Sequence, residues 1–371
     1  MPFIETLDSI IRDIIAPQAH EIDQQARFPR AALDALGASG LLGLTTSQSM
    51  GGMGLGLAEA ATVIERIATH CASTAMVVTM HYAANAVIEQ FASDEIRRKV
   101  ALGQHVSTLA WSESGSRSHF WAPLGTAEKV QEGYLLNCSK TMVTSAGEVH
   151  SYIWSSRPAQ AEGASSLWLV DARAEGLTIT KTYDGLGLRG NASAPMRCAH
   201  LKVTEADLLG ADGAGFDVMI NTVLPVFAVL NASCSIGLME GALAGAIQHV
   251  SGNKLQHLDS TLADLPTIRA YLAKARIRAD QARTLRDDTL TALSTGRADA
   301  MLRVMEVKAS AAEAALEVTD AAMRVCGGAA FRKDLGIERH FRDARAAAIM
   351  APTSDVLYDF IGKAICGLPV F

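Results

Sequence analysis

The chain has 371 residues, a length at which two or three packed subdomains are expected to share a large buried interior. Its 33 basic and 39 acidic residues give a formal net charge of -6 without any basic block, so nucleic acid and anionic membranes are not expected partners. Hydrophobic residues make up 49% and aromatic residues 5% of the chain, and its many alanines are typical of closely packed helices. A mostly helical fold and a small-molecule substrate are therefore the first predictions.

The first hundred residues have helical periodicity. Apolar residues recur at intervals of three and four from residue 4 to about residue 103, for example in LAEAATVIERIATH and AANAVIEQF. Turn signals at 28–29 and 51–54 separate the predicted helices. Residues 1–104 are therefore predicted to form an N-terminal helical domain.

Beyond residue 105 the pattern changes to short segments with strand character, separated by Gly, Ser and Asn. The predicted strands cover residues 134–138, 151–155, 167–170, 177–180 and 196–203. Together they predict a small middle β-domain over residues 105–211.

Helical patterning returns at Gly215 and continues to the C-terminus. The clearest predicted helix covers residues 297–325, where charged residues follow one stripe and Ala and Met residues supply the buried faces. A helix of this length and composition is typical of a bundle. Residues 212–371 are therefore predicted to form a C-terminal four-helix-bundle domain, and the fold class is α+β, mostly α.

The cysteines and the N-terminus indicate the kind of protein. The six cysteines are scattered and form no CxxC pair, so neither a metal site nor a disulfide framework is predicted. The first residues, MPFIETLDSIIRDII, lack the basic start and the cleavage site of a signal peptide. No apolar run is expected to reach the ~18 to 20 residues of a membrane span. We therefore predict a cytoplasmic protein with reduced thiols and no membrane partner.

Five local motifs occur in a characteristic order. They are WSESGSRSH at 111–119, LNCSKTMVTSAG at 136–147, GLGLRG at 185–190, CGG at 326–328 and ERHFRDAR at 338–345. With the opening helices, this ordered set resembles the acyl-CoA dehydrogenase superfamily essentially from end to end. The resemblance implies FAD between the β-domain and the bundle, completed by a neighbouring subunit of a homo-oligomer, either a dimer or a tetramer. It also implies an acyl thioester of CoA or of a carrier protein as substrate, which loses an α-proton to a Glu and a β-hydride to flavin N5.

The residue predicted to do this proton transfer is missing. The family's catalytic Glu aligns with Ala351 in the segment MAPTSD at 350–355, and the alternative position used by some relatives falls at Phe227. Neither side chain can accept a proton. His81 is one candidate for a relocated base, because a histidine near its ordinary pKa of roughly 6.5 can accept a proton. Asp355 is the nearest carboxylate in sequence; the alternatives are an ordinary packed histidine and an aspartate that serves the helix dipole.

The resemblance also assigns cofactor contacts. They are Ser112, Met142, Thr144, Lys254, Gly327, Gly328 and Thr353. Ser112 and Thr144 stand at two hydroxyl positions that contact the isoalloxazine, with ordinary loop and strand hydroxyls as the alternative, and Met142 replaces an aromatic cover. The glycines at 327–328 permit a close backbone approach, either to the cofactor or to another helix.

Three residues are predicted to bind substrate. Arg117, Ser118 and His119 belong to the loop that lines the acyl-carrier tunnel in the family. Arg117 could hold a phosphate or a carboxylate. A solvated loop arginine is the alternative.

Three functional hypotheses follow from these observations. The first is an FAD-dependent, acyl-CoA dehydrogenase-like enzyme with a relocated or missing base. The second is a flavin-dependent monooxygenase, or a redox-neutral cyclisation or elimination, on the same fold. The third is a non-catalytic subunit of a hetero-oligomer.

Overall fold

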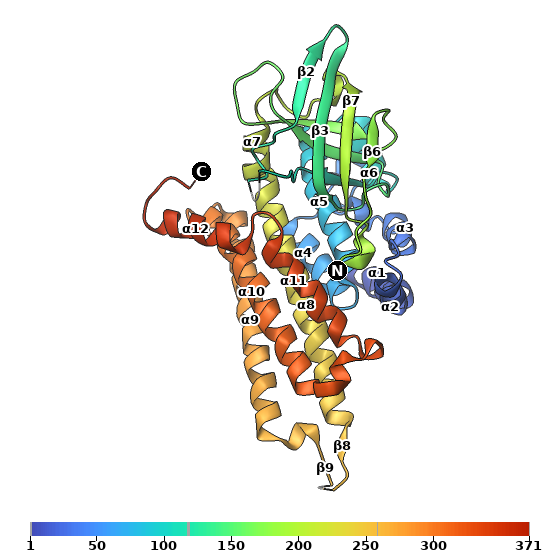
Figure 1. Cartoon of the computed structure of the whole chain (residues 1–371), viewed down its shortest axis with the longest axis vertical. Coiled ribbons are helices and arrows are strands. Elements are labelled where there is room, and N and C mark those ends of the chain that lie inside the picture. The colour runs from blue at the N-terminus through green and yellow to red at the C-terminus, as the bar shows by residue number, and fades with distance from the viewer. Residues whose placement is uncertain (1, 117–118, 258, 371) are drawn as a thin grey trace.

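The computed structural model describes residues 2–116, 119–257 and 259–370. A helical N-terminal part, a small β-domain and a long helical bundle follow one another along the chain (Figure 1). This is the predicted α+β, mostly α architecture. The predicted boundaries at 104/105 and 211/212 fall in the connections after α6 and before α7, and the division into domains stays a prediction.

The N-terminal helices pack around α5, Ala72–Phe91, which is buried along almost its whole length. The other helices are α1 Pro2–Ile10, α2 Ala16–Gln24, α3 Arg30–Ala38, α4 Leu57–Ala68 and α6 Asp94–Ala101, with the π-helical turn Ile11–Ile15 joining α1 to α2. One side of α5 packs against the first strand of the β-domain and another against the bundle helix α8. The central helix therefore contributes to both of the other parts of the fold.

The β-domain contains two sheets. One has the order β1-β4-β5 and the other the order β2-β3-β7-β6. The strands are β1 Ser107–Ala110, β2 Thr126–Val130, β3 Gly133–Val143, β4 Ser151–Ser156, β5 Ser166–Asp171, β6 Leu177–Ile179 and β7 Ala194–Val203. Alternate residues of β3 and β7 are buried, as expected where one face of a sheet packs on the core. All five predicted strands are present, and β1 and β2 are two that the sequence pattern did not indicate.

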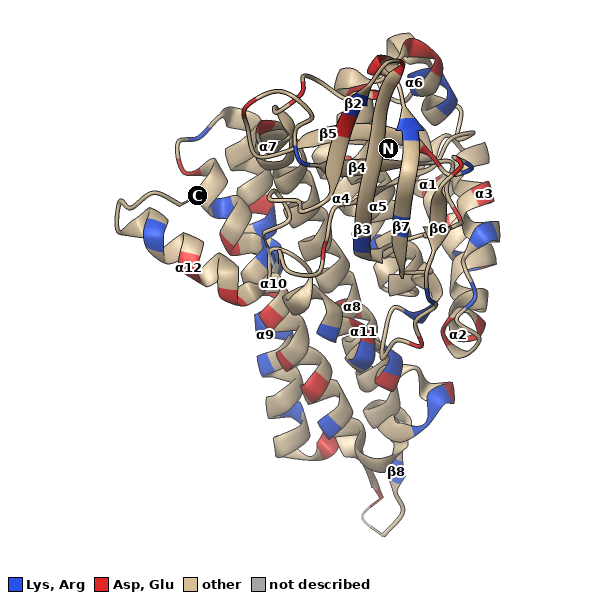
Figure 2. Cartoon of the chain, turned by 45° about the horizontal axis from the view of Figure 1, so that its top comes forward, with Lys and Arg blue, Asp and Glu red and all other residues tan. Residues whose placement is uncertain are grey.

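The bundle is formed by α8 Leu224–Gly252, α9 Pro266–Thr295, α10 Ala300–Cys326 and α11 Ile337–Ile349, with α12 Ser354–Ile365 projecting to one side (Figure 1). The short helix α7, Gly215–Asp217, and the π-helical turn Val218–Val223 lead into α8, and a small hairpin, β8 Lys254–Leu255 with β9 Ser260–Thr261, joins α8 to α9. Alanines at the buried positions of α10 let its neighbours approach closely. Both acidic and basic residues lie along α9, as Figure 2 shows.

One prediction about apolar runs was wrong. The helical run from Gly215 to Gly252, 38 residues long, is apolar enough to cross a membrane by length and composition, with a mean hydropathy of 1.8 over 18 residues. Scattered Gly, Ser and Asn residues interrupt the apolar residues, so the sequence does not show one continuous apolar run. Of that window, 83% is buried inside the protein, where the helix packs against α4, α9 and α10.

Candidate functional site

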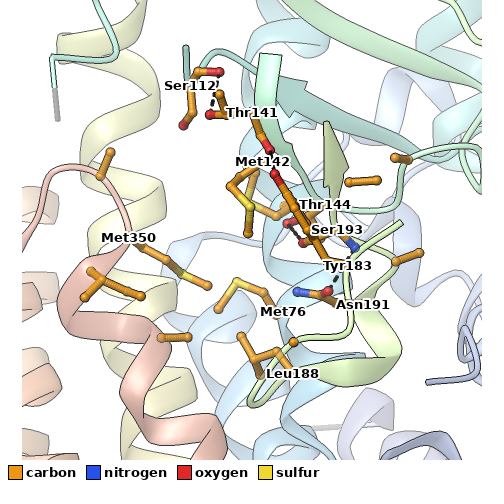
Figure 3. Close-up of a pocket in the computed structure, with 18 of the residues that line it drawn as sticks. Met76, Ser112, Thr141, Met142, Thr144, Tyr183, Leu188, Asn191, Ser193 and Met350 are labelled. Atoms are coloured by element: carbon orange, nitrogen blue, oxygen red, sulfur yellow. Dashed lines mark hydrogen bonds between the residues drawn. The ribbon is translucent and has the colours of Figure 1, made fainter. Parts of the chain in front are cut away.

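A cavity of about 1510 Å³ lies between the β-domain and the helical bundle (Figure 3). Its walls come from β3, the loop at 182–194, α5, the start of α8, and α11 with the loop that follows it. Pockets for one drug-sized ligand are roughly 300–1,000 Å³. This cavity is therefore large enough to hold a cofactor ring and a substrate together.

Hydroxyl groups line the β-domain side of the cavity. Ser112, Thr141, Thr144 and Ser193 follow this wall in Figure 3. The Thr141 N–H donates to the Ser112 carbonyl at 2.9 Å, and the Thr144 and Ser193 hydroxyl oxygens are 3.2 Å apart. Neutral groups of this kind suit the polar edge of a flat heteroaromatic ring such as a flavin. Two of the predicted cofactor contacts, Ser112 and Thr144, lie together on this wall.

Met142 projects into the cavity because β3 is irregular at this point. The pairing of β3 with β7 shifts between Lys140 and Val143, and the Met142 residue is 54% exposed. Figure 3 shows Met142, Met76 and Met350 around the same space. A thioether is polarisable and packs well against aromatic faces. Met142 is thus suited to cover one face of a bound ring, as predicted for its position.

Both vacated base positions, Ala351 and Phe227, line this cavity. The side chains around them are apolar: Met80, Leu109, Trp111, Phe120, Val223 and Leu224. Trp111 stacks on Phe120 with ring centroids 5.8 Å apart and planes 14° apart. This end of the cavity is suited to an acyl chain, and its described walls bring no carboxylate to Ala351.

Glu113 is a buried carboxylate in the cavity wall. Its Oε1 accepts a hydrogen bond from Lys140 Nζ at 2.6 Å, and Oε2 accepts from the backbone N–H groups of Leu124 and Gly125 at 2.7 and 3.1 Å. Lys140 Nζ also donates to the Ser155 carbonyl and hydroxyl, which ties β3 to β4. Both carboxylate oxygens are engaged, so Glu113 stabilises the β-domain and is not a free base.

Glu148 and Asp184 are the other carboxylates of the described cavity wall. Glu148 pairs with Arg30 at 2.6 Å, and Asp184 pairs with Arg189. Both pairs lie at the exposed rim. Among the described residues, the cavity therefore has no unpaired carboxylate.

A buried lysine fixes the loop that carries Ala351. Lys308 of α10 is fully buried, and its Nζ donates to the carbonyl oxygens of Ala347, Met350 and Pro352 at 3.1, 3.0 and 2.8 Å. Burial lowers the pKa of Lys308 to about 7. The three hydrogen bonds hold both ends of the segment that presents Ala351 to the cavity.

His81 does not lie at the cavity, so the structure does not support it as the base. Its Nδ1 accepts from the Ser107 N–H at 3.3 Å, and Nε2 is 3.0 Å from the Leu42 carbonyl, to which it donates in the matching tautomer. Burial lowers the pKa of His81 to about 4. Both ring nitrogens are occupied, and the histidine joins α5 to the β-domain.

Asp355 and His119 also lie outside the cavity wall. Asp355 is exposed in the first turn of α12, which is capped by Thr353 accepting from the Val356 N–H at 3.4 Å. His119 makes an edge contact with Trp121 at 5.1 Å. The other two predicted substrate contacts, Arg117 and Ser118, lie outside the described residues. Thr353 itself lines the cavity, in keeping with its predicted cofactor contact.

Three predicted cofactor contacts lie away from this cavity. Lys254 is exposed in the hairpin at the far end of the bundle (Figure 1). A Cβ added at Gly327 or Gly328 would meet no described atom within 4 Å, so the expected close approach to another helix does not occur within this chain. Gly327 has a φ of +56°, and its conformation ends α10. The cofactor contacts predicted for Lys254, Gly327 and Gly328 therefore stay predictions.

Sequence reasoning missed Lys308, the Lys140–Glu113 pair and the arginines of the cavity wall. Lys308 has a visible signal, since it is a lone charge on the buried Ala- and Val-rich face of α10. The Lys140–Glu113 pair and the cavity arginines have no such signal in the neighbouring sequence, because their environment is formed by other segments of the chain.

Three family models match the chain. They are the Acyl-CoA dehydrogenase N-terminal domain over residues 2–103, the middle domain over 108–200 and the C-terminal domain over 213–366. The chain is 28% identical over 358 residues to the short-chain specific acyl-CoA dehydrogenase of Sus scrofa mitochondria, covering 92% of this chain and 84% of that protein.

Two solved structures show the same fold. Butyryl-CoA dehydrogenase from Megasphaera elsdenii superimposes with a TM-score of 0.92 at 21% identity, covering 98% of this chain and 97% of the other. TdsC from Paenibacillus sp. A11-2, solved with FMN and indole, superimposes with a TM-score of 0.87 at 20% identity, covering 99% and 98%. The fold alone therefore does not determine which flavin or which substrate is bound.

Proposed function

Because this chain belongs to the acyl-CoA dehydrogenase family, whose members are FAD-binding flavin oxidoreductases, we propose that it is an FAD-dependent enzyme that acts at the α and β carbons of an acyl thioester without the family's carboxylate base. The acyl group would be carried by CoA or by a carrier protein. A homo-oligomer in the cytoplasm, as is typical of the family, is part of this proposal. The observation that carries it is a cavity with a hydroxyl wall, an apolar end and no unpaired carboxylate among its described residues.

The cavity walls suit a flavin. Bound FAD would supply a hydride acceptor in its ring. Ser112 and Thr144 would hydrogen-bond the polar edge of the ring, and Met142 would cover one face. Met76 and Met350 would help to exclude water from the space between the ring and the substrate.

The acyl end of the cavity suits binding better than proton transfer. Trp111 and Phe120 would hold the acyl chain, and Lys308 would keep the loop with Ala351 in place. A positioned base contributes about 10²–10⁴-fold to a reaction of this kind. With Ala351 and Phe227 in the two base positions, removal of the α-proton by a side chain of this wall is not expected, and simple dehydrogenation should be slow.

Titration of the purified full chain with FAD tests the proposal. We expect the visible flavin spectrum to change on binding and to change again when acyl thioesters are added. Ser112→Ala and Thr144→Ala should weaken FAD binding, whereas Ser294→Ala, at an exposed site on α9, should not. A protein that takes up no flavin would refute the proposal and favour a non-catalytic subunit.

A flavin-dependent monooxygenase is the second candidate. The missing base and the apolar walls around Ala351 favour it, because oxygen transfer from a reduced flavin does not need a carboxylate above the α-carbon. Oxygen consumption supported by externally supplied reduced flavin, and stimulated by a substrate, would favour this reaction. Its absence, together with reduction of bound flavin by a thioester, would favour dehydrogenation.

A further inference from the structure

Among the described residues, three arginines line the cavity, and two of them form ion pairs within the chain. Arg342 pairs with Asp23 at 2.6 Å and with Glu338 at 2.5 Å. Arg189 pairs with Asp184. Their charges are therefore matched by carboxylates before any ligand binds.

Arg345 is the third arginine, and it has no such partner. Its Nε donates to the Phe341 carbonyl at 3.2 Å, and its guanidinium carbon lies 4.1 Å from the centre of the Phe341 ring. Its Nη2 is buried without a hydrogen-bond partner, and no described carboxylate lies within ion-pair distance. Contacts with its own helix thus hold the stem of Arg345 and leave the buried Nη2 without a hydrogen-bond partner.

The fold directs Arg345 to one part of the cavity. Arg342, Arg345, Ala346 and Ile349 form the cavity face of α11, since they recur at helical spacing and all line the cavity. The loop at 184–189 is held against the start of this face, where a Cβ on Gly187 would lie only 2.6 Å from the Arg342 carbonyl carbon. Arg345 lies about one turn, or roughly 6 Å, before the end of α11. It therefore lies on the cavity face of α11, about one turn before the loop that carries Ala351.

A guanidinium in a partly enclosed cavity costs free energy unless an anion or several acceptors satisfy it. Arginine matches the oxygens of phosphate and carboxylate with two parallel N–H groups. Among the described residues, no carboxylate forms an ion pair with Arg345. The missing partner is therefore expected to arrive with a ligand.

We propose that Arg345 binds an oxyanion of a ligand in this cavity, either a phosphate of the flavin nucleotide or a carboxylate carried by the acyl group. The inference rests on the proposed function and assigns Arg345 as the anion-binding residue of that site. It explains why Arg345 has no carboxylate partner, whereas Arg189 and Arg342 in the same cavity are paired.

Flavin analogues that differ only in phosphate provide the first test. Riboflavin, FMN and FAD share the ring, so their dissociation constants are measured with the wild-type chain and with Arg345→Met by fluorescence quenching. If the ligand group is a phosphate, Arg345→Met should weaken FMN and FAD about ten- to hundredfold and leave riboflavin unchanged. Arg339→Met, on the same helix but outside the cavity, is the matched control.

Thioesters with and without a terminal carboxylate provide the second test. If the ligand group is a carboxylate, Arg345→Met should weaken glutaryl-CoA about ten- to hundredfold and leave butyryl-CoA unchanged, with all three flavins unaffected. Equal losses for the members of each set with and without the extra anionic group, or no loss in either set, would overturn the assignment. A wild-type chain that binds no flavin would refute the proposed function, while the thioester comparison still decides the role of Arg345.

A folding defect in Arg345→Met would not prevent the test. Arg345→Lys keeps the charge but loses the paired N–H groups, so the same selectivity should appear with a smaller change. In the wild-type chain, added salt should reduce the preference for the ligand that has the extra phosphate or carboxylate over the ligand that lacks it. A preference that does not change with salt and is not affected by Arg345→Lys would count against the assignment.

Discussion

Lys140 and Lys308 are both fully buried, and they lie behind opposite walls of the same cavity. On the β-domain side, the Lys140 ammonium is 2.6 Å from the carboxylate of Glu113. On the bundle side, the Lys308 ammonium is surrounded by three backbone carbonyl oxygens and no carboxylate. The comparison shows two ways to bury a lysine. Lys140 forms an ion pair with a buried carboxylate, whereas Lys308 is held by peptide carbonyl groups alone and its protonation depends on pH.

Removal of Lys140 should have the larger effect on stability. Lys140→Met leaves the buried carboxylate of Glu113 without its partner, and breaking a buried pair in this way costs about 3–5 kcal/mol. Urea unfolding followed by circular dichroism would give the change in the free energy of unfolding. The double variant Lys140→Met with Glu113→Gln should recover part of the loss, and a loss equal to the sum of the two single variants would contradict the pairing.

Removal of Lys308 should cost less, because no carboxylate is stranded. Lys308→Met leaves three carbonyl groups without a donor, for which we expect a loss of about 1–3 kcal/mol in the free energy of unfolding. The same urea experiment measures it. A loss as large as that of Lys140→Met would show that the two sites do not differ as described.

Lys308 should also make the stability of the protein depend on pH. The pKa of Lys308 is lowered from 10.5 to about 7, so between these values the unfolded chain binds a proton that the folded chain does not. The free energy of unfolding should therefore rise with pH above about 7, by at most ~1.4 kcal/mol per pH unit from this residue. This rise in the free energy of unfolding should be present in the wild type and absent in Lys308→Met. Identical pH dependence of the two proteins between pH 7 and 9 would contradict a depressed pKa at Lys308.

Local periodicity was sufficient to predict the helices, the bundle and five strands. It missed β1, since the four residues Ser107–Ala110 are all buried and show no alternation. It also missed β2, because this strand lies at a sheet edge and carries exposed charged residues. β1 and β2 depend on pairing with other strands, which their own pattern of residues does not show, and the short strands β8 and β9 were not predicted either.

Alignment with family motifs located several residues of the candidate site. It could not locate residues whose role depends on contacts with segments distant in sequence. Ala351, Phe227, Ser112 and Thr144 line the cavity, as their alignment with family motifs indicated. His81, predicted as a candidate base, lies outside the cavity wall, and its ring contacts two backbone groups that are 26 and 39 residues away in sequence. The unpaired state of Arg345 follows from which carboxylates are absent around it, and such an absence is visible only in the folded chain.

Restoring a carboxylate at Ala351 tests the central claim most directly. Rates of anaerobic flavin reduction by a panel of acyl thioesters are compared for FAD-loaded wild type, Ala351→Glu and the uncharged control Ala351→Gln. We predict that reduction is slow in the wild type and in Ala351→Gln, and about 10²–10⁴-fold faster in Ala351→Glu with at least one thioester. Rapid reduction of the wild-type flavin, not accelerated by Ala351→Glu, would contradict the claim that this cavity lacks a base for the α-proton.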